Sequence, residues 1–188
     1  TLDRAVYGLR ESPFLWSQER DRRLEELRWT VGSKTYRIRR CPSDSQVWRI
    51  IDEAVPDVYL GLMIVYVDDF LLLTDTGPIR DGFLKQLSSV WTLAKEETLT
   101  PEHPITFLGI ELEMRKNHDI FLNQRAFIFH TLKKHEVLNH KGASSIQIDK
   151  LPTEPDLPSD AEKKKLQGFS GEFNWLATRT RPDISYAT

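Results

Sequence analysis

The sequence predicts an α+β fold built from short antiparallel strands and amphipathic helices. Apolar residues recur at helical spacing in four segments, and the stretches between them hold strand-forming runs separated by short polar turns. With 188 residues, of which 39% are hydrophobic, the chain is long and apolar enough to form a core. Its one cysteine, Cys41, excludes an intramolecular disulfide and a cysteine-based zinc site. No apolar run approaches the roughly 20 residues of a membrane helix, so no membrane span is expected.

In the first half of the chain, the sequence predicts two helices with a group of strands between them. Helices are expected over 12–29 and 79–90, and strands over 30–39, 46–51, 60–67 and 70–73. Ser12 is expected to cap the first helix, with Pro13 in its first turn. Asp68 and Asp69 then occupy the turn that joins the last two strands, each of which is strongly apolar.

The second half predicts a hairpin followed by two helices. The expected elements are strands over 107–114 and 120–123, a helix over 124–136, and a helix from Asp160 to just before Pro182. Between the two helices, the stretch around Pro152, Pro155 and Pro158 has little apolar periodicity and predicts a linker. The last helix is expected to bury Phe169, Phe173, Trp175 and Leu176.

The charges are unevenly distributed, although the net charge is only −2. The net charge is +4 over residues 1–40, −9 over 41–113 and +3 over 114–188. An acidic centre between basic ends would suit a cation site between surfaces that contact a polyanion, although this pattern alone is weak support.

Asp68 and Asp69 carry the chemistry that the residues themselves suggest. Aspartate is common in turns, so such a pair is more often a plain hairpin turn. Here the flanking runs are apolar enough to be buried, which places both carboxylates on a core hairpin and favours a functional role. Two adjacent carboxylates repel each other unless a cation neutralises them, and Mg²⁺ uses one or two carboxylates together with substrate phosphates. Paired ions of this kind occur in polymerases and nucleases.

Five segments, in the expected order, resemble the reverse transcriptase of copia-type long-terminal-repeat retrotransposons, a part of their Pol polyprotein. The segments are Ala5 to Trp16 (AVYGLRESPFLW), Ser43-Asp44 before Val47-Trp48, the YVDD sequence Tyr66 to Asp69, Phe107 to Leu112 (FLGIEL) with the later Gln124, and Thr180 to Ala187 (TRPDISYA). The resemblance runs from the YGL segment to the segment that precedes the ribonuclease H region. One departure is Glu11, where the family has glutamine, and it would place an acidic group near the template or nucleotide.

The resemblance implies roles for individual residues. Asp68 and Asp69 would be catalytic metal ligands for Mg²⁺ or Mn²⁺. Residues that would contact template or nucleotide are Tyr7, Gly8, Leu9, Arg10 and Tyr66. A hairpin that grips the primer would contain Phe107, Leu108, Gly109 and Ile110. A solvated charge explains Arg10 equally well, and a plain core hairpin explains the last group equally well.

The resemblance also implies a fold and a domain arrangement. The chain would be a reverse-transcriptase palm, an antiparallel sheet with helices, followed by thumb or connection segments. The expected parts are a partial palm with both hairpins over 1–123, a thumb-like helix over 124–138, a linker over 139–159 and a thumb or connection helix segment over 160–188. The fingers and the first palm strand, which carries the family's third aspartate, would precede Thr1.

The expected function is RNA-directed DNA polymerisation by two-metal nucleotidyl transfer in the full polyprotein. The DNA that it makes would then be integrated. We expect little or no activity from this chain alone, because the third aspartate is absent from it. The expected partners are an RNA or DNA template with its primer, a deoxynucleoside triphosphate, and the rest of the Pol polyprotein including ribonuclease H, with no membrane. The expected location is intracellular, either in cytoplasmic virus-like particles or in the nucleus.

Two other functions stay open. The chain could be a non-catalytic nucleic-acid-binding remnant or a co-opted copy of such an element, which the missing aspartate favours and the intact YVDD sequence opposes. A Mg²⁺-dependent hydrolase unrelated to polymerases would need a further acidic ligand, for which Asp75 and Glu111 are the candidates.

Overall fold

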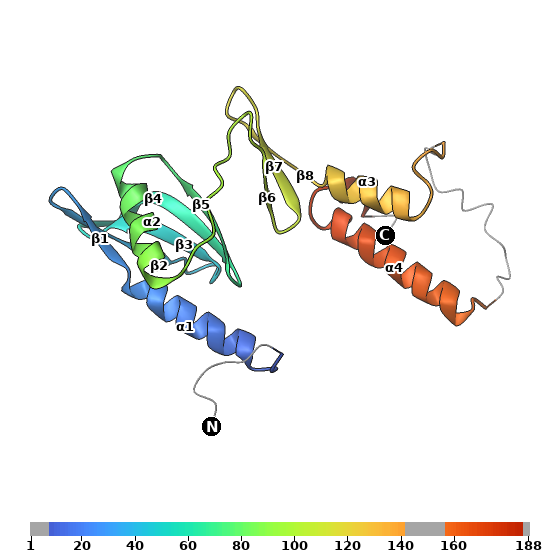
Figure 1. The fold of residues 1–188 in the computed structure, drawn as a ribbon, viewed down its shortest axis with the longest axis horizontal. Coiled ribbons are helices and arrows are strands. Elements are labelled where there is room, and N and C mark those ends of the chain that lie inside the picture. The colour runs from blue at the N-terminus through green and yellow to red at the C-terminus, as the bar shows by residue number, and fades with distance from the viewer. Residues whose placement is uncertain (1–7, 142–156, 186–188) are drawn as a thin grey trace. The chain divides into compact units, whose positions relative to one another are not determined.

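A computed structural model describes residues 8–141 and 157–185, and confirms the α+β class (Figure 1). The chain divides into two compact units, with the boundary between Glu96 and Glu97. This boundary groups the strands over 105–123 with the C-terminal helices. Tyr7 and most of the expected linker lie outside the described residues. Within the described ranges, no helix is long and apolar enough to cross a membrane.

The first unit is a five-stranded antiparallel sheet with two helices on one face. Its elements are α1 (Ser12–Glu26), β1 (Arg28–Val31), β2 (Lys34–Arg40), β3 (Val47–Asp52), β4 (Val55–Tyr66), β5 (Asp69–Thr74) and α2 (Pro78–Val90). The strands lie in the order β1-β2-β3-β4-β5, so β1 and β5 form the edges. The expected strands and the second helix are confirmed.

Alternation along the strands builds the core of this unit. In the regular parts of the strands, every second residue points toward α1 and α2, because successive side chains in a strand point to opposite faces. The alternation is interrupted at the register shift around Ile51. The buried cluster consists of Leu24, Leu27, Trp29, Tyr36, Ile38, Trp48, Ile50, Met63, Val65, Phe83 and Leu87. Trp29 and Phe83 pack with ring centroids 5.3 Å apart, which joins β1 to α2. Gly82 permits this approach, since a Cβ there would lie 2.5 Å from Cδ1 of Trp29.

The first helix differs from the prediction at both ends. It ends at Glu26, and Trp29 belongs to β1, where it pairs with Tyr36. The predicted continuation to Trp29 is wrong because strand pairing and burial against α2 outweigh the apolar spacing. The N-cap position is held by Glu11, which makes no side-chain capping hydrogen bond, and Ser12 is the first helical residue. Glu11 already has helical backbone angles, so the helix starts one position earlier than a cap at Ser12 requires.

The second unit combines a small sheet with two helices. Its elements are β6 (Ile105–Phe107), β7 (Ile110–Met114), β8 (Ile120–Asn123), α3 (Arg125–Lys134), α4 (Asp160–Ala177) and the 3₁₀ turn η2 (Pro182–Ile184). The expected hairpin is confirmed, since β7 pairs with β8, but its first strand starts at Ile110 and not at Phe107, because Leu108 and Gly109 form a turn between β6 and β7. Their φ angles of 53° and 74° lie in the left-handed region, which favours glycine and ends a strand.

The last helix begins with a complete capping box. The Ser159 side chain accepts from the backbone N–H of Glu162, and the Glu162 carboxylate accepts from the Ser159 N–H. Leu176 is buried as expected, whereas the three expected aromatic residues are only partly buried. One of them, Phe169, stacks on His135 with ring centroids 3.6 Å apart.

The contact between α3 and α4 should depend on pH through Glu172. Hydrogen bonds from Lys134 and then His135 lower the pKa of the Glu172 carboxyl below its ordinary value of 4.5. A carboxyl with a depressed pKa stabilises the folded state above its unfolded pKa, and that stabilisation is lost as the pH falls through its folded pKa. We therefore expect the free energy of unfolding of this unit to decrease below about pH 4.5. Urea titrations at several pH values should show a smaller decrease for Glu172→Gln, and equal decreases would contradict the assignment.

Candidate metal and nucleic-acid site

The two aspartates lie at the tip of a tight hairpin between β4 and β5. Tyr66 pairs with Asp69, so Val67 and Asp68 form a two-residue turn. Asp68 and Asp69 are both exposed, whereas Met63 and Val65 of the same hairpin are fully buried. The expected hairpin is thus confirmed, with both carboxylates exposed at its tip and with buried residues further along its strands.

The turn has an unusual backbone conformation at Val67. Its φ of 52° lies in the left-handed region, as at the first position of type II′ turns, where glycine is usual. A β-branched residue rarely adopts such angles, and observed outliers of this kind cluster at functional sites. Val67 is also about half exposed, so burial of its side chain is not what holds it there.

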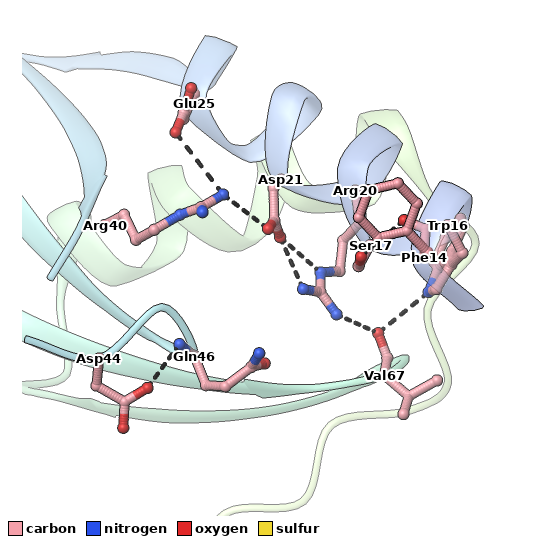
Figure 2. A network of polar contacts seen from close by, with 10 residues as sticks. All are labelled: Phe14, Trp16, Ser17, Arg20, Asp21, Glu25, Arg40, Asp44, Gln46 and Val67. Carbon is pink, nitrogen blue, oxygen red and sulfur yellow. Dashed lines mark hydrogen bonds and ion pairs between the residues drawn. The ribbon is translucent and has the colours of Figure 1, made fainter. Parts of the chain in front are cut away.

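Helix α1 holds the turn through the carbonyl oxygen of Val67. Trp16 Nε1 donates to this oxygen at 3.1 Å, and Arg20 Nη1 donates to it at 2.9 Å (Figure 2). Arg20 is 2% exposed, and its Nε and Nη2 both donate to Oδ1 of Asp21. Oδ2 of Asp21 in turn accepts from Arg40 of β2 at 2.7 Å. Sequence reasoning identified Trp16 only as part of a motif and gave no role to Arg20, Asp21 or Arg40.

The donor set at the turn suits a hard divalent cation. Carboxylate oxygens are the protein ligands that Mg²⁺ prefers, and exposure leaves room for water and phosphate ligands. Within residues 8–141 and 157–185, no group of three or more His, Cys, Asp or Glu side chains could hold a metal ion. The residues therefore fit part of a metal site, and a full coordination sphere needs ligands from substrate or from further protein.

A hydrolase would need a further acidic ligand, and the two candidates lie in different units of the chain. Asp75 follows the far end of β5, about 20 Å from Asp69 at about 3.3 Å per strand residue. Glu111 belongs to the second unit, where its Oε1 accepts from the backbone N–H of Ala126 at 2.8 Å. Within the first unit, Asp75 therefore does not join Asp68 and Asp69, and Glu111 is described only within the second unit.

The expected template and nucleotide residues fall into separate places. Tyr66 is exposed beside Asp69, as the expected role requires. Gly8, Leu9 and Arg10 are exposed directly before α1, whose first turns approach the hairpin through Trp16. The expected primer-grip residues Phe107, Leu108, Gly109 and Ile110 belong to the second unit, so each is described only within that unit.

The face of the sheet opposite the helices carries arginines that sequence reasoning missed. Arg39 and Arg49 lie directly across from each other on β2 and β3. Arg49 donates to the Tyr59 hydroxyl at 2.7 Å and lies over its ring at 4.8 Å. Among the residues with described positions, neither arginine is ion-paired with an acidic side chain. Opposed like charges destabilise a sheet, so this pair is suited to an anionic ligand. The alternation of residues 35–40 was the signal that could have revealed it.

Several motif residues have structural roles. Asp44 Oδ1 accepts from the backbone N–H of Gln46 at 2.8 Å, which shapes the turn before β3. Gln124 is buried, and its Oε1 accepts from the Thr180 hydroxyl at 2.9 Å, so two separate motifs of the second unit meet. These contacts explain the motif residues without assigning them to a ligand.

Comparison with known proteins finds relatives along nearly the whole chain. Over 99% of its length, the chain is 28% identical to the retrovirus-related Pol polyproteins from transposons RE2 and RE1 of Arabidopsis thaliana. Over 96% of its length, it is 22% identical to the putative transposon Ty5-1 protein of Saccharomyces cerevisiae. The chain spans only 12% and 11% of the two polyproteins and 53% of the yeast protein. No protein-family model matches the chain, and no solved structure matches it significantly.

These similarities confirm the resemblance to retrotransposon Pol polyproteins that the motifs indicated. The chain is similar, over nearly its whole length, to a segment of such a polyprotein.

Proposed function

We propose that the chain is part of an RNA-directed DNA polymerase of a copia-type retrotransposon, with its first unit in the palm. The observation that carries the proposal is the exposed Asp68-Asp69 pair at the tip of a core hairpin, in a chain similar to Pol polyproteins throughout. An antiparallel sheet with helices on one face and the carboxylates at the end of two strands supports a palm. The second unit would then supply thumb or connection segments.

Asp68 and Asp69 would hold Mg²⁺ or Mn²⁺ in this function. When bound, such ions would activate the primer hydroxyl and neutralise charge on the incoming triphosphate. The chain's own contribution is positioning, since Trp16 and Arg20 hold the turn and Tyr66 lies exposed beside the carboxylates. Because β5 is an edge strand, a further strand could pair there and bring another carboxylate toward the site.

The nucleic-acid partner would contact the open face of the sheet. Arg39 and Arg49 would contact backbone phosphates, and the exposed ring of Tyr59 offers a surface on which a base can stack. Such binding is strongly salt-dependent and weakly sequence-dependent.

The double variant Arg39→Gln/Arg49→Gln should therefore weaken binding of a template–primer duplex. We expect about a tenfold or greater loss of affinity at low salt and a salt slope smaller by about 2, because each phosphate contact contributes about one unit to that slope. Fluorescence anisotropy at several salt concentrations measures both quantities.

The control is Arg22→Gln/Arg23→Gln on α1. It removes the same charge, but both side chains already bond to Glu19, whose pKa is lowered to about 2 by hydrogen bonds from Arg22 and then Arg23. Equal losses in both double variants would contradict a specific surface. Absence of any binding at low salt would contradict nucleic-acid binding and with it the polymerase proposal.

A non-catalytic nucleic-acid-binding protein is the second candidate. It is favoured because the described residues bring no third acidic ligand to Asp68 and Asp69. Primer extension on an RNA template, with Mg²⁺ or Mn²⁺, separates the two functions. We expect no extension by this chain alone and Asp68-dependent extension by a version lengthened at its N-terminus by an aspartate-bearing strand. Duplex binding without extension in both versions would support the second candidate and overturn the first.

The remaining partners follow from the proposal. A deoxynucleoside triphosphate would be the substrate, and the rest of a Pol polyprotein, including ribonuclease H, would complete the enzyme. The location would be a cytoplasmic virus-like particle or the nucleus.

A further inference from the structure

We infer that Arg20 is a positioning residue that sets the direction of the Asp68 carboxylate from inside the core. The inference rests on the proposed function of the turn, and it adds a device that holds the turn in one conformation. Arg20 lies on α1, 47 residues before Val67 in the chain, and it does not itself face a ligand.

The guanidinium of Arg20 is aimed by its own ion pair. Two of its nitrogens, Nε and Nη2, donate to Oδ1 of Asp21 at 2.9 and 2.7 Å. Since the guanidinium is a rigid planar fork, these two bonds fix the direction of Nη1, which donates to the Val67 carbonyl at 2.9 Å. The Arg20 side chain is 2% exposed, so water has little access to its guanidinium.

Arg40 ties this pair to the sheet. Its Nη2 donates to Oδ2 of Asp21 at 2.7 Å, and its guanidinium lies 5.1 Å from the ring centroid of the fully buried Trp48. The Asp21 carboxylate is thus held between two arginines from different elements (Figure 2). These contacts thereby fix the position of the hairpin turn relative to both α1 and β2.

The Val67 carbonyl is an effective place to hold the turn. This carbonyl belongs to the planar peptide unit that also contains the nitrogen of Asp68, so a fixed carbonyl direction fixes the plane from which the Asp68 side chain departs. Val67 has a φ of 52°, a conformation that the residue would readily leave without support. Trp16 supplies a second, neutral donor to the same oxygen, whereas Arg20 supplies the charged and buried one.

The test compares Arg20→Met with Gly82→Ala in the full chain. Gly82→Ala destabilises the same unit through the contact between α2 and Trp29, away from the turn, and controls for loss of stability. We expect Arg20→Met to lower the ¹⁵N order parameter of the Asp68 amide from a rigid value of about 0.85 to below about 0.6 without metal. It should also weaken Asp68-dependent Mn²⁺ binding about tenfold. Gly82→Ala should change neither the Asp68 order parameter nor the Mn²⁺ affinity. Arg20→Lys should lower both less than Arg20→Met does.

Asp21→Asn is a milder second variant in case Arg20→Met does not fold. This substitution keeps the size of the side chain but weakens its hydrogen bonds to the Arg20 guanidinium. It should lower the Asp68 order parameter and the Mn²⁺ affinity by a smaller amount than Arg20→Met does. An unchanged Asp68 order parameter in the folded variants overturns the inference, and so does a loosened turn with unchanged Mn²⁺ affinity. A wild-type chain without Asp68-dependent Mn²⁺ binding contradicts the proposed function instead, and the order parameter alone then decides whether Arg20 positions the turn.

Discussion

Asp68→Asn is expected to abolish the specific binding of Mn²⁺ and to slow nucleotide incorporation by an N-terminally lengthened version of the chain. Asparagine keeps the size and one oxygen of the side chain but loses the negative charge that a divalent ion requires. Metal ions contribute several kcal/mol to charge stabilisation in phosphoryl transfer, and each 1.36 kcal/mol is tenfold in rate. We therefore expect incorporation by the N-terminally lengthened version to decrease by a factor on the order of 10³.

Water-proton relaxation or calorimetry measures the binding, and primer extension measures the rate. The matched control is Asp75→Asn, which removes the same charge from an exposed aspartate at the other end of β5. Equal Mn²⁺ affinity in the wild type and in Asp68→Asn would refute the assignment of Asp68 as a metal ligand. Equal losses in both variants would show only a general electrostatic attraction.

Phe83→Ala is expected to cause a large loss of stability in the first unit. Phe83 is fully buried and packs on Trp29, so the substitution removes both a buried ring and its aromatic contact. Truncation of a buried phenylalanine costs about 3–5 kcal/mol, whereas a whole domain is stable by only about 5–15 kcal/mol. We expect the urea midpoint of this unit, followed by tryptophan fluorescence, to decrease steeply.

Leu73→Ala is the control for that experiment. Leu73 is 43% exposed on β5 and lies outside the buried cluster, so its truncation should change the free energy of unfolding far less. Similar losses in the two variants would contradict the core that the structure defines.

The energetics of the hairpin turn explain why two donors meet at one carbonyl. A non-glycine residue held at positive φ costs of order 1–3 kcal/mol. A neutral hydrogen bond contributes about 0.5–1.5 kcal/mol and a hydrogen bond to a charged group about 1.5–3 kcal/mol. The bonds from Trp16 and Arg20 to Val67 are together of the size needed to offset this cost. Helix α1 therefore supports the conformation of the turn in addition to the pairing of β4 with β5.

Local patterns were sufficient for the class and for most elements. The α+β class, the Asp68-Asp69 hairpin and α2 follow from apolar periodicity, which depends only on neighbouring residues. The ordered motifs were sufficient for the similarity to Pol polyproteins. Roles for the candidate metal and nucleotide residues stay predictions, because they depend on ligands and not on the fold alone.

The tertiary structure decided what joins distant residues. It placed Trp29 in a strand, broke the expected strand at Leu108-Gly109, and brought Arg39 opposite Arg49. It also brought Arg20 to the Val67 carbonyl, although 47 residues separate them. No periodicity encodes such contacts, because they depend on how helices pack on the sheet and on strand register, which only the folded chain as a whole determines.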